Sequence, residues 1–256
     1  MNVAAVQFDI VWEDPPANFQ KVRRLLDSAR VEPEALVVLP EMFATGFSMR
    51  VSDPGDIHRF LHETARQFRV FLTAGVASPD PSGKGRNEAV AMDPDGNLFA
   101  TYRKIHPFSC ARETDHFVPG DAIVTFPWRG FTVAPFICYD LRFPEIFRTA
   151  VMKGVNLFLV LANWPKVRDP HWRALLTARA IENQACVVGV NRRGADPKHE
   201  YAGSTRIIDP KGQILADAES RETVLQADLD LDALLAYRRE FPALTDIRPE
   251  FLTDPS

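Results

Sequence analysis

The stretch Phe131-Thr-Val-Ala-Pro-Phe-Ile-Cys-Tyr-Asp-Leu-Arg-Phe-Pro-Glu145 begins as an apolar run and turns polar at Cys138. Residues 131–137 are too few for a typical globular helix, and a short, almost wholly apolar run is typical of a strand buried on both faces. Pro144 suits the first turn of a helix, and Glu145 favours the positive end of a helix dipole, so a helix is predicted to follow. The sequence therefore places Cys138 at the carboxyl end of a buried strand.

Two roles are open to a thiol in this place. In open α/β sheets, ligands bind beyond the carboxyl ends of the strands, and the positive potential of helix N-termini there would make a thiol easier to ionise. Most free cysteines are instead small hydrophobic core residues. The stretch alone leaves both interpretations of Cys138 open.

Composition predicts one globular domain and argues against several classes of protein. The chain has 256 residues, of which 46% are hydrophobic and 25% charged, enough to bury a large core. We expect residues 1–256 to form a single domain, with 241–256 as a C-terminal tail. A net charge of −4 argues against the broad basic surface that nucleic acid or an anionic membrane would require.

The predicted location is the cytoplasm. The three cysteines have no close paired spacing, which fits a reducing compartment better than a disulfide framework or a zinc cluster. The sequence has neither a signal-peptide pattern nor an apolar run of about twenty residues, so we expect no secretion and no membrane span.

The N-terminal part of the chain alternates between predicted strands and helices. Short apolar runs indicate buried strands, and apolar residues at helical spacing indicate the helices between them. A strand–helix–strand unit normally has parallel strands. The second strand ends at Pro40, so Glu41 occupies the same kind of place as Cys138. The predicted elements are strands at 2–8, 35–39 and 70–77 and helices at 19–29 and 56–68.

Two similar hairpins suggest that the chain has two similar halves. Asp93-Pro-Asp-Gly-Asn97 and Asp209-Pro-Lys-Gly-Gln213 each suit a tight turn between antiparallel strands. Cys186 lies in an apolar run and is expected in the core. The remaining predicted elements are strands at 88–92, 98–102, 155–162, 186–190, 204–208 and 214–216 and helices after Pro144, at 170–184 and at 230–239.

Four polar motifs carry a resemblance to a known family. They occur in the order and approximate spacing of the nitrilase superfamily of carbon–nitrogen hydrolases, which the chain resembles over nearly its whole length. Within it, the chain resembles the omega-amidase branch, the bacterial YafV-like enzymes, through residues 40–49, 138–144 and 162–165 with 171–184. The motifs are Pro40-Glu41, Lys104-x-His106, Arg112-Glu113 and Cys138-Tyr-Asp-Leu-Arg-Phe-Pro144.

The resemblance implies a fold and a set of catalytic residues. The fold would be α/β, a four-layer αββα sandwich, which agrees with two similar halves. The family's Glu-Lys-Cys triad falls on Glu41, Lys104 and Cys138, and its second glutamate falls on Glu113. The implied enzyme needs neither a metal nor an organic cofactor.

Each role suits its residue type. Glu41 would accept the thiol proton as a general base, and the thiolate would attack an amide carbon. Lys104 and the backbone N–H of Tyr139 would stabilise the negative charge on the carbonyl oxygen. Glu113 would keep Lys104 charged and in place, or would position water.

The omega-amidase resemblance implies a substrate with a carboxylate, the terminal amide of a short 2-oxo acid such as 2-oxoglutaramate or 2-oxosuccinamate. Arg168 is the candidate to bind that carboxylate, because a guanidinium in the loop after a buried strand could grip it bidentately; a solvated loop arginine is the alternative. Arg142 is the weaker candidate, since it could pair with Glu145. Phe43 and Trp164 could wall the pocket, with core packing as the alternative for Phe43.

Other interpretations stay open. A helical pair, His58 and His62, could begin a metal site, but a third ligand with suitable spacing is missing, so we predict no metal. A papain-like hydrolase would leave the glutamate and lysine pattern unexplained, and no signature of that class surrounds the cysteine. In a papain-like hydrolase, the Cys138 thiol would pair with one of the histidines His106, His116 and His171.

Within the superfamily, the alternatives are an aliphatic amidase, a carbamoylase or a nitrilase, because the same thiol could attack a nitrile carbon. A non-catalytic binding protein on the same fold is an alternative of a different class. The resemblance also implies a homodimer.

Overall fold

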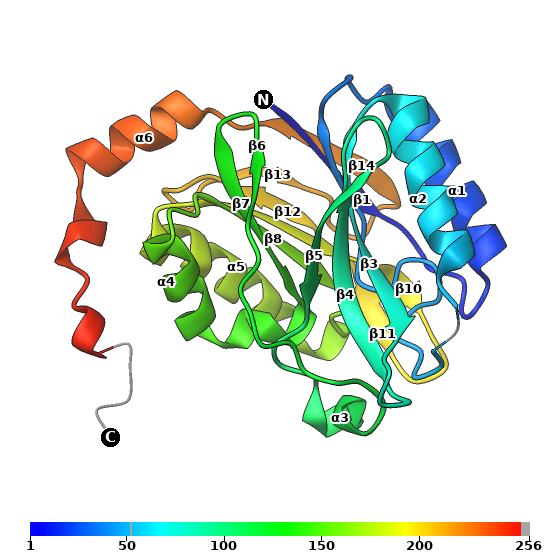
Figure 1. The fold of residues 1–256 in the computed structure, drawn as a ribbon. Coiled ribbons are helices and arrows are strands. Elements are labelled where there is room, and N and C mark those ends of the chain that lie inside the picture. The colour runs from blue at the N-terminus through cyan, green and yellow to red at the C-terminus, as the bar shows by residue number, and fades with distance from the viewer. Residues whose placement is uncertain (52, 252–256) are drawn as a thin grey trace.

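The structure is a computed structural model that describes residues 1–51 and 53–251. Two six-stranded sheets face each other (Figure 1). The first sheet has the order β14 (Thr223–Asp228), β1 (Asn2–Gln7), β2 (Leu36–Val38), β3 (Phe71–Pro79), β4 (Gly85–Met92) and β5 (Leu98–Arg103). The second has the order β13 (Ile214–Asp217), β12 (Arg206–Ile208), β9 (Cys186–Asn191), β8 (Leu157–Ala162), β7 (Phe131–Ile137) and β6 (Phe126–Trp128).

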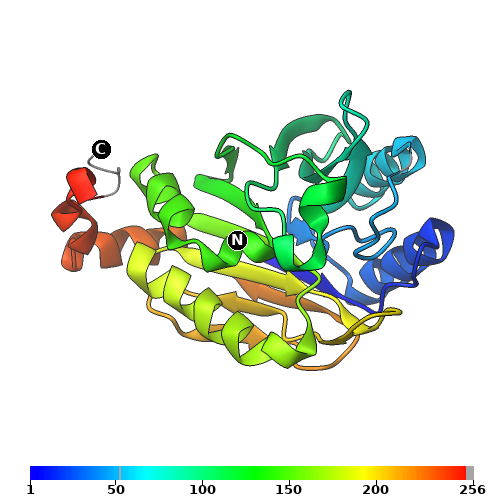
Figure 2. The same ribbon diagram turned by 90° about the horizontal axis from the view of Figure 1, so that it is seen from below.

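Helices cover the outer face of each sheet, so the molecule has four layers (Figures 1 and 2). The first sheet is covered by α1 (Pro15–Ala29) and α2 (Gly55–Phe68), and the second by α4 (Pro144–Met152) and α5 (Asp169–Asn183). The predicted αββα sandwich is thereby confirmed. Among the described residues, no helix is both long and apolar enough to span a membrane.

Strand periodicity explains how one sheet can serve two cores. Successive side chains of a strand point to opposite faces. In β1, Val3 and Ala5 belong to the cluster that faces the second sheet, whereas Ala4 and Val6 pack with the residues of α1 and α2. The first sheet is therefore apolar on both faces, as its continuous apolar runs predicted.

Both sheets repeat one arrangement, which confirms the two similar halves. In the first sheet β1, β2 and β3 are parallel, and the antiparallel hairpin β4–β5 follows. In the second sheet β7, β8 and β9 are parallel, and the antiparallel hairpin β12–β13 follows. Glu41 comes after β2 and Cys138 directly after β7, so both lie beyond the carboxyl ends of parallel strands.

Some elements differ from the sequence prediction. Strands β6, β14 and the small sheet of β10 (Arg193–Ala195) and β11 (Glu200–Ala202) were not predicted, because these short segments contain no continuous apolar run. The segment after β5, for which the sequence predicted no element, contains a 3-10 turn, η1 (Ser109–Ala111), and a short helix, α3 (Glu113–His116). The backbone N–H of Phe108 donates to the Glu113 carboxylate, and the backbone N–H of Phe117 donates to the Glu113 carbonyl. These two hydrogen bonds hold η1 and α3 together.

The C-terminal segment begins on the second sheet and then leaves it. Arg238, in α6 (Leu231–Glu240), donates to the carbonyl oxygens of Gln184 and Val155. Over the 3-10 turns η4 (Ala243–Asp246) and η5 (Pro249–Phe251) the chain lies away from α4 and α5 in both views (Figures 1 and 2). The end of the predicted tail, residues 252–256, lies outside the described residues.

Asp140 joins the two sheets at the edge that carries the candidate site residues. It lies in η2 (Cys138–Arg142), directly after β7, and its carboxylate is fully buried. One oxygen accepts the hydroxyl of Tyr102 at 2.8 Å and the backbone N–H of Ile137 at 3.0 Å. The other accepts the backbone N–H of His106 at 2.9 Å and lies 2.9 Å from its Nδ1. Burial and the Asp140 charge raise the pKa of Tyr102, so the phenol remains a donor.

We expect Asp140→Leu to lower the free energy of unfolding by about 3–5 kcal/mol, because it leaves several buried donors without an acceptor. Asp140→Asn should cost about 1–3 kcal/mol, since one acceptor oxygen remains. Urea unfolding at neutral pH measures both, with Asp95→Asn, an exposed turn acid, as the control. Equal stability of Asp140→Leu and the unchanged protein would show that this carboxylate does not hold the sheets together.

Candidate active site

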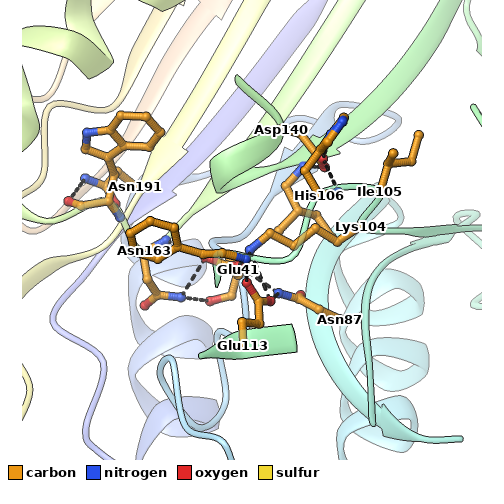
Figure 3. Close-up of polar contacts among 12 residues, drawn as sticks. Glu41, Asn87, Lys104, Ile105, His106, Glu113, Asp140, Asn163 and Asn191 are labelled. Atoms are coloured by element: carbon orange, nitrogen blue, oxygen red, sulfur yellow. Dashed lines mark hydrogen bonds and ion pairs between the residues drawn. The ribbon is translucent and has the colours of Figure 1, made fainter. Parts of the chain in front are cut away.

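Glu41, Lys104 and Glu113 meet in a buried cluster between the two sheets (Figure 3). Lys104 follows β5 and is 1% exposed, and both glutamates are fully buried. Its Nζ lies 2.9 Å from Oε1 of Glu41, and 2.8 and 3.1 Å from the two carboxylate oxygens of Glu113. The structure thus brings together three residues that are far apart in the sequence.

The charges of the cluster keep Lys104 protonated. Burial alone would lower the pKa of its ammonium. Attraction from Glu113 and then Glu41 outweighs burial and holds the pKa of Lys104 above its ordinary value. The single Lys104 ammonium therefore balances only one of the two carboxylate charges.

Residues of both sheets fix the position of Glu41. The backbone N–H of Asn163, which follows β8, donates to Oε2 of Glu41 at 2.9 Å, and the Asn163 amide donates to the Glu41 carbonyl at 2.7 Å. Asn87, in β4, donates to Oε1 at 2.8 Å. A Cβ on Gly75 of β3 would lie 2.4 Å from the Glu41 Cα, so only glycine lets the two segments approach this closely.

Cys138 is the first residue of η2, directly after β7, and its backbone is strained. Its φ of 46° is in the left-handed region, which residues other than glycine rarely adopt. Burial and then the Glu41 charge raise the pKa of the thiol well above its ordinary value, and Lys104 opposes them only in part. The expectation that this position makes the thiol easier to ionise was wrong, because burial and the carboxylate outweigh any gain from the short turn. A base must therefore take the proton before the sulfur can act as a nucleophile.

A narrow cavity opens onto Cys138, which is 9% exposed. Its wall is mostly aromatic and includes two guanidinium groups. The other lining residues are Phe47, Phe108, Tyr139, Arg142, Asn163, Trp164, Pro165, Arg168, His199 and Tyr201.

Arg142 and Arg168 both line the cavity, so the structure does not separate the two candidates for a carboxylate ligand. The Arg142 guanidinium lies 4.8 Å from the Trp164 ring centroid, and that of Arg168 lies 5.4 Å from the ring of Phe108. The considered pair between Arg142 and Glu145 does not form among the described residues, where Arg142 lies 3.3 Å from His171 instead. Arg168 likewise has no ion pair with an acid of the described residues. Both guanidinium groups therefore line the cavity without an acidic partner in the part of the chain that the structure describes.

Trp164 lines the cavity as predicted, but Phe43 does not. Phe43 is fully buried in the core under α1 and α2, with ring centroids 6.2 Å from Phe19 and 5.9 Å from Phe60. Its backbone N–H donates to the carbonyl of Gly75, which keeps this segment alongside β3. Core packing was thus the correct alternative, and the aromatic residue of this segment in the cavity wall is Phe47.

Tyr139 is the second residue of η2, and its side chain lines the cavity. N–H groups in the first turn of a helix have no partner within that helix. Tyr139 directly follows Cys138 in the sequence. The role of its backbone N–H in stabilising an oxyanion stays a prediction.

The histidines considered as partners of Cys138 are engaged elsewhere. His106 bonds to Asp140 and stacks on Phe143 at 3.7 Å. His171 lies 3.3 Å from Arg142, and His116 is exposed on α3. Over the described residues, no group of three or more histidine, cysteine or acidic side chains is arranged to hold a metal ion.

Sequence reasoning missed Asn87, Asn163 and Asp140 as site residues. Asn163 follows β8 as Glu41 follows β2, so a polar residue after a buried strand was a usable signal. Asn87 lies inside a strand and Asp140 inside a turn, where a single polar residue has no such distinguishing position.

Comparison with known proteins agrees with this geometry. Residues 2–239 match the family model of the carbon-nitrogen hydrolases. Omega-amidase YafV of Escherichia coli K12 is 38% identical over 252 residues, 96% of each chain, and 2-oxoglutaramate amidase of Bacillus subtilis is 33% identical over 254 residues, 97% of this chain and 98% of that one.

A solved structure shares the fold closely. XC1258 of Xanthomonas campestris, a CN-hydrolase superfamily protein with an arsenic adduct in its active site, superposes with a TM-score of 0.91 at 32% identity, covering 97% of both chains. Nit3 of Saccharomyces cerevisiae, a member of the nitrilase superfamily, gives a TM-score of 0.85 at 27% identity over 94% of both chains. The resemblance read from the sequence is confirmed, and the chain belongs to the carbon–nitrogen hydrolase family of the nitrilase superfamily.

Proposed function

We propose that this chain is an amidase that hydrolyses the terminal amide of a short 2-oxo acid, such as 2-oxoglutaramate or 2-oxosuccinamate, to the oxo-dicarboxylate and ammonia. The names of its relatives, omega-amidase and 2-oxoglutaramate amidase, support this substrate class. The observation that carries the proposal is one arrangement: a thiol in the lining of a cavity, a buried carboxylate and ammonium whose charges act on it, and two arginines in the cavity wall.

The first half-reaction forms a thioester. Glu41 accepts the proton of the Cys138 thiol, and the sulfur attacks the amide carbon while the electrons of the C=O bond move to oxygen. The Lys104 ammonium and the Tyr139 N–H stabilise this oxyanion. The C–N bond then breaks, and the leaving nitrogen takes the proton from Glu41 and departs as ammonia.

The second half-reaction returns the enzyme to its starting state. Glu41 takes a proton from water, and the oxygen attacks the thioester carbon to form a second oxyanion at the same place. The C–S bond breaks, the acid is released, and Cys138 recovers its proton. Glu113 holds Lys104 in position through both steps, which its two contacts with Nζ support.

Recognition of the substrate is assigned to the cavity wall. Arg168, with Arg142, is proposed to bind the carboxylate of the 2-oxo acid, because a guanidinium matches a carboxylate with two parallel hydrogen bonds. Trp164 lines the same cavity as the two arginines and the thiol, and its indole N–H donates to the Arg168 carbonyl at 2.8 Å, which couples the two residues.

A homodimer, a cytoplasmic location and a single domain over residues 1–256 are proposed on the family resemblance and composition alone.

Ammonia release from a panel of compounds tests the proposed function. The panel consists of 2-oxoglutaramate, 2-oxosuccinamate, propionamide, a carbamoyl amine and an aliphatic nitrile. We expect the two 2-oxo acid amides to give kcat/KM values at least about 10²-fold above the others, as two charge-assisted hydrogen bonds would supply. Equal turnover of propionamide would reject the substrate class, and preference for the nitrile would reassign the enzyme as a nitrilase.

Cys138→Ala should lower kcat by at least about 10⁴-fold, because no other group can form the thioester. Circular dichroism should show an unchanged fold. Cys110→Ala, which removes an exposed thiol, serves as the control and should keep full activity. Substantial residual turnover by Cys138→Ala would refute the covalent mechanism.

Arg168→Ala should raise KM for 2-oxoglutaramate by about 10–100-fold, the loss expected for a hydrogen-bonded charge pair. Arg142→Ala should act in the same direction if both guanidinium groups bind the carboxylate. Propionamide, which has no carboxylate, should be turned over by both variants at the unchanged rate, with Arg112→Ala on the exposed surface as the control. A loss shared equally by propionamide would remove carboxylate binding as the role of these residues.

A further inference from the structure

Asn87 touches every charged member of the buried cluster. It lies in β4 and is 1% exposed. Its Nδ2 donates to Oε1 of Glu41 and to Oε1 of Glu113, both at 2.8 Å, and its backbone carbonyl accepts the N–H of Lys104 at 2.9 Å (Figure 3). One side chain thus bridges the two carboxylates that share a single ammonium.

This bridge acts on an unbalanced charge. Glu41, Glu113 and Lys104 together carry one excess negative charge, and none of the three is more than 1% exposed. A buried charge is stable only when donors surround it. Without a donor between them, repulsion between the two carboxylates favours retention of a proton on one of them. Of the hydrogen bonds among the described residues, Asn87 and Lys104 provide those that reach both glutamates.

The acceptor end of the Asn87 amide supports this interpretation. Its Oδ1 is buried and accepts no hydrogen bond from the described residues. Buried polar atoms in proteins nearly always have a partner, so an orphan oxygen needs a reason. If the Asn87 amide were rotated by about 180°, Oδ1 would face two carboxylate oxygens and be repelled by them. The two glutamates therefore fix the observed orientation of the amide.

We propose that Asn87 is a positioning residue that holds Glu41 and Glu113 on the one Lys104 ammonium and so keeps Glu41 unprotonated, ready to accept the thiol proton. The inference rests on the proposed function, because it assigns Glu41 as the base. The groups that face Asn87 are Glu41 after β2, Lys104 after β5 and Glu113 from α3, and the charges of these three residues also act on the Cys138 thiol. Its neighbour in the strand, Glu88, bonds instead to Ser78 of β3.

Asn87→Leu keeps the size of the side chain and removes both donors. We expect kcat for 2-oxoglutaramate to fall by about 10–100-fold, with KM changed by less than about threefold, because the base and not the carboxylate site is affected. The acid limb of kcat/KM should move to higher pH, because a proton retained between the two glutamates must first be lost.

Asn87→Asp gives a second, distinctive result. The new carboxylate adds a third negative charge at neutral pH, so activity should be lower than in Asn87→Leu. As the pH falls, the new carboxyl group gains a proton that it can donate to one glutamate, so activity relative to the unchanged enzyme should recover. A merely structural role for Asn87 predicts no such pH dependence.

The matched control is Asn156→Leu. Asn156 is also a buried asparagine, and its Oδ1 accepts the N–H of Thr132, at a place outside the lining of the cavity. Asn156→Leu should lower the free energy of unfolding in urea and leave the acid limb of kcat/KM at the same pH. If Asn87→Leu behaves like Asn156→Leu, with no shift of the acid limb, the positioning role is overturned.

A measurement without an amide separates this inference from the proposed function. The rate at which iodoacetamide alkylates Cys138 is followed by mass spectrometry of the peptide that contains it, across pH, with Cys138→Ala as the blank. We expect Asn87→Leu to slow alkylation near neutral pH, because the base that takes the thiol proton is partly protonated. An unchanged rate overturns the positioning role, whereas a slower rate in a protein that turns over none of the amides sustains it and rejects only the proposed function.

Discussion

The ammonium of Lys104 between two buried glutamates is the interaction on which the site depends. Burying three charges is costly unless each is paired and every remaining lone pair has a donor. Glu41 and Glu113 meet that condition through Lys104 and through N–H groups of Asn87, Asn163 and Phe108. The ion cluster is therefore stable only when β4, β5, α3 and the segments after β2 and β8 are all in place, which ties the local chemistry to the complete fold.

The repeated arrangement of the two sheets explains why these segments converge. Glu41 follows β2 and Asn163 follows β8, the second parallel strands of their sheets. These equivalent positions face each other, and the Asn163 N–H reaches the Glu41 carboxylate across the interface. Asp140 adds a second link, from the turn after β7 to Tyr102 at the end of β5. Each half alone would present strand ends with unpaired polar groups, so the site is a product of packing the halves together.

The sequence allowed much of this to be predicted, through two different routes. The position of a polar residue directly after a buried strand marked Glu41 and Cys138, and the same rule would have marked Asn163. Lys104 and Glu113 came from the family resemblance, because charged residues near strand ends and in turns are usually solvated. The state of the thiol was predicted wrongly, since a sequence shows that a helical turn follows Cys138 but not that burial and Glu41 outweigh it. Asn87 escaped prediction because its contacts come from three segments that are distant in the sequence.

The residues proposed for substrate recognition and those proposed for bond cleavage lie in parts of the molecule with different structural constraints. The cluster of Glu41, Lys104 and Glu113 is buried and linked by hydrogen bonds, whereas Arg168 belongs to a short surface turn, η3 (Lys166–Arg168), and His199 and Tyr201 to the β10–β11 hairpin. What joins the two parts is Trp164, whose backbone N–H and carbonyl are both bonded to the Asn191 side chain at the end of β9, at 2.7 and 3.1 Å. Because Trp164 directly follows Asn163, the same anchored segment orients the donor to Glu41 and the wall of the cavity. We therefore expect substitutions in the turn and the hairpin to change the cavity wall without altering the geometry of Glu41, the proposed base, whereas a change at Asn191 would disturb both.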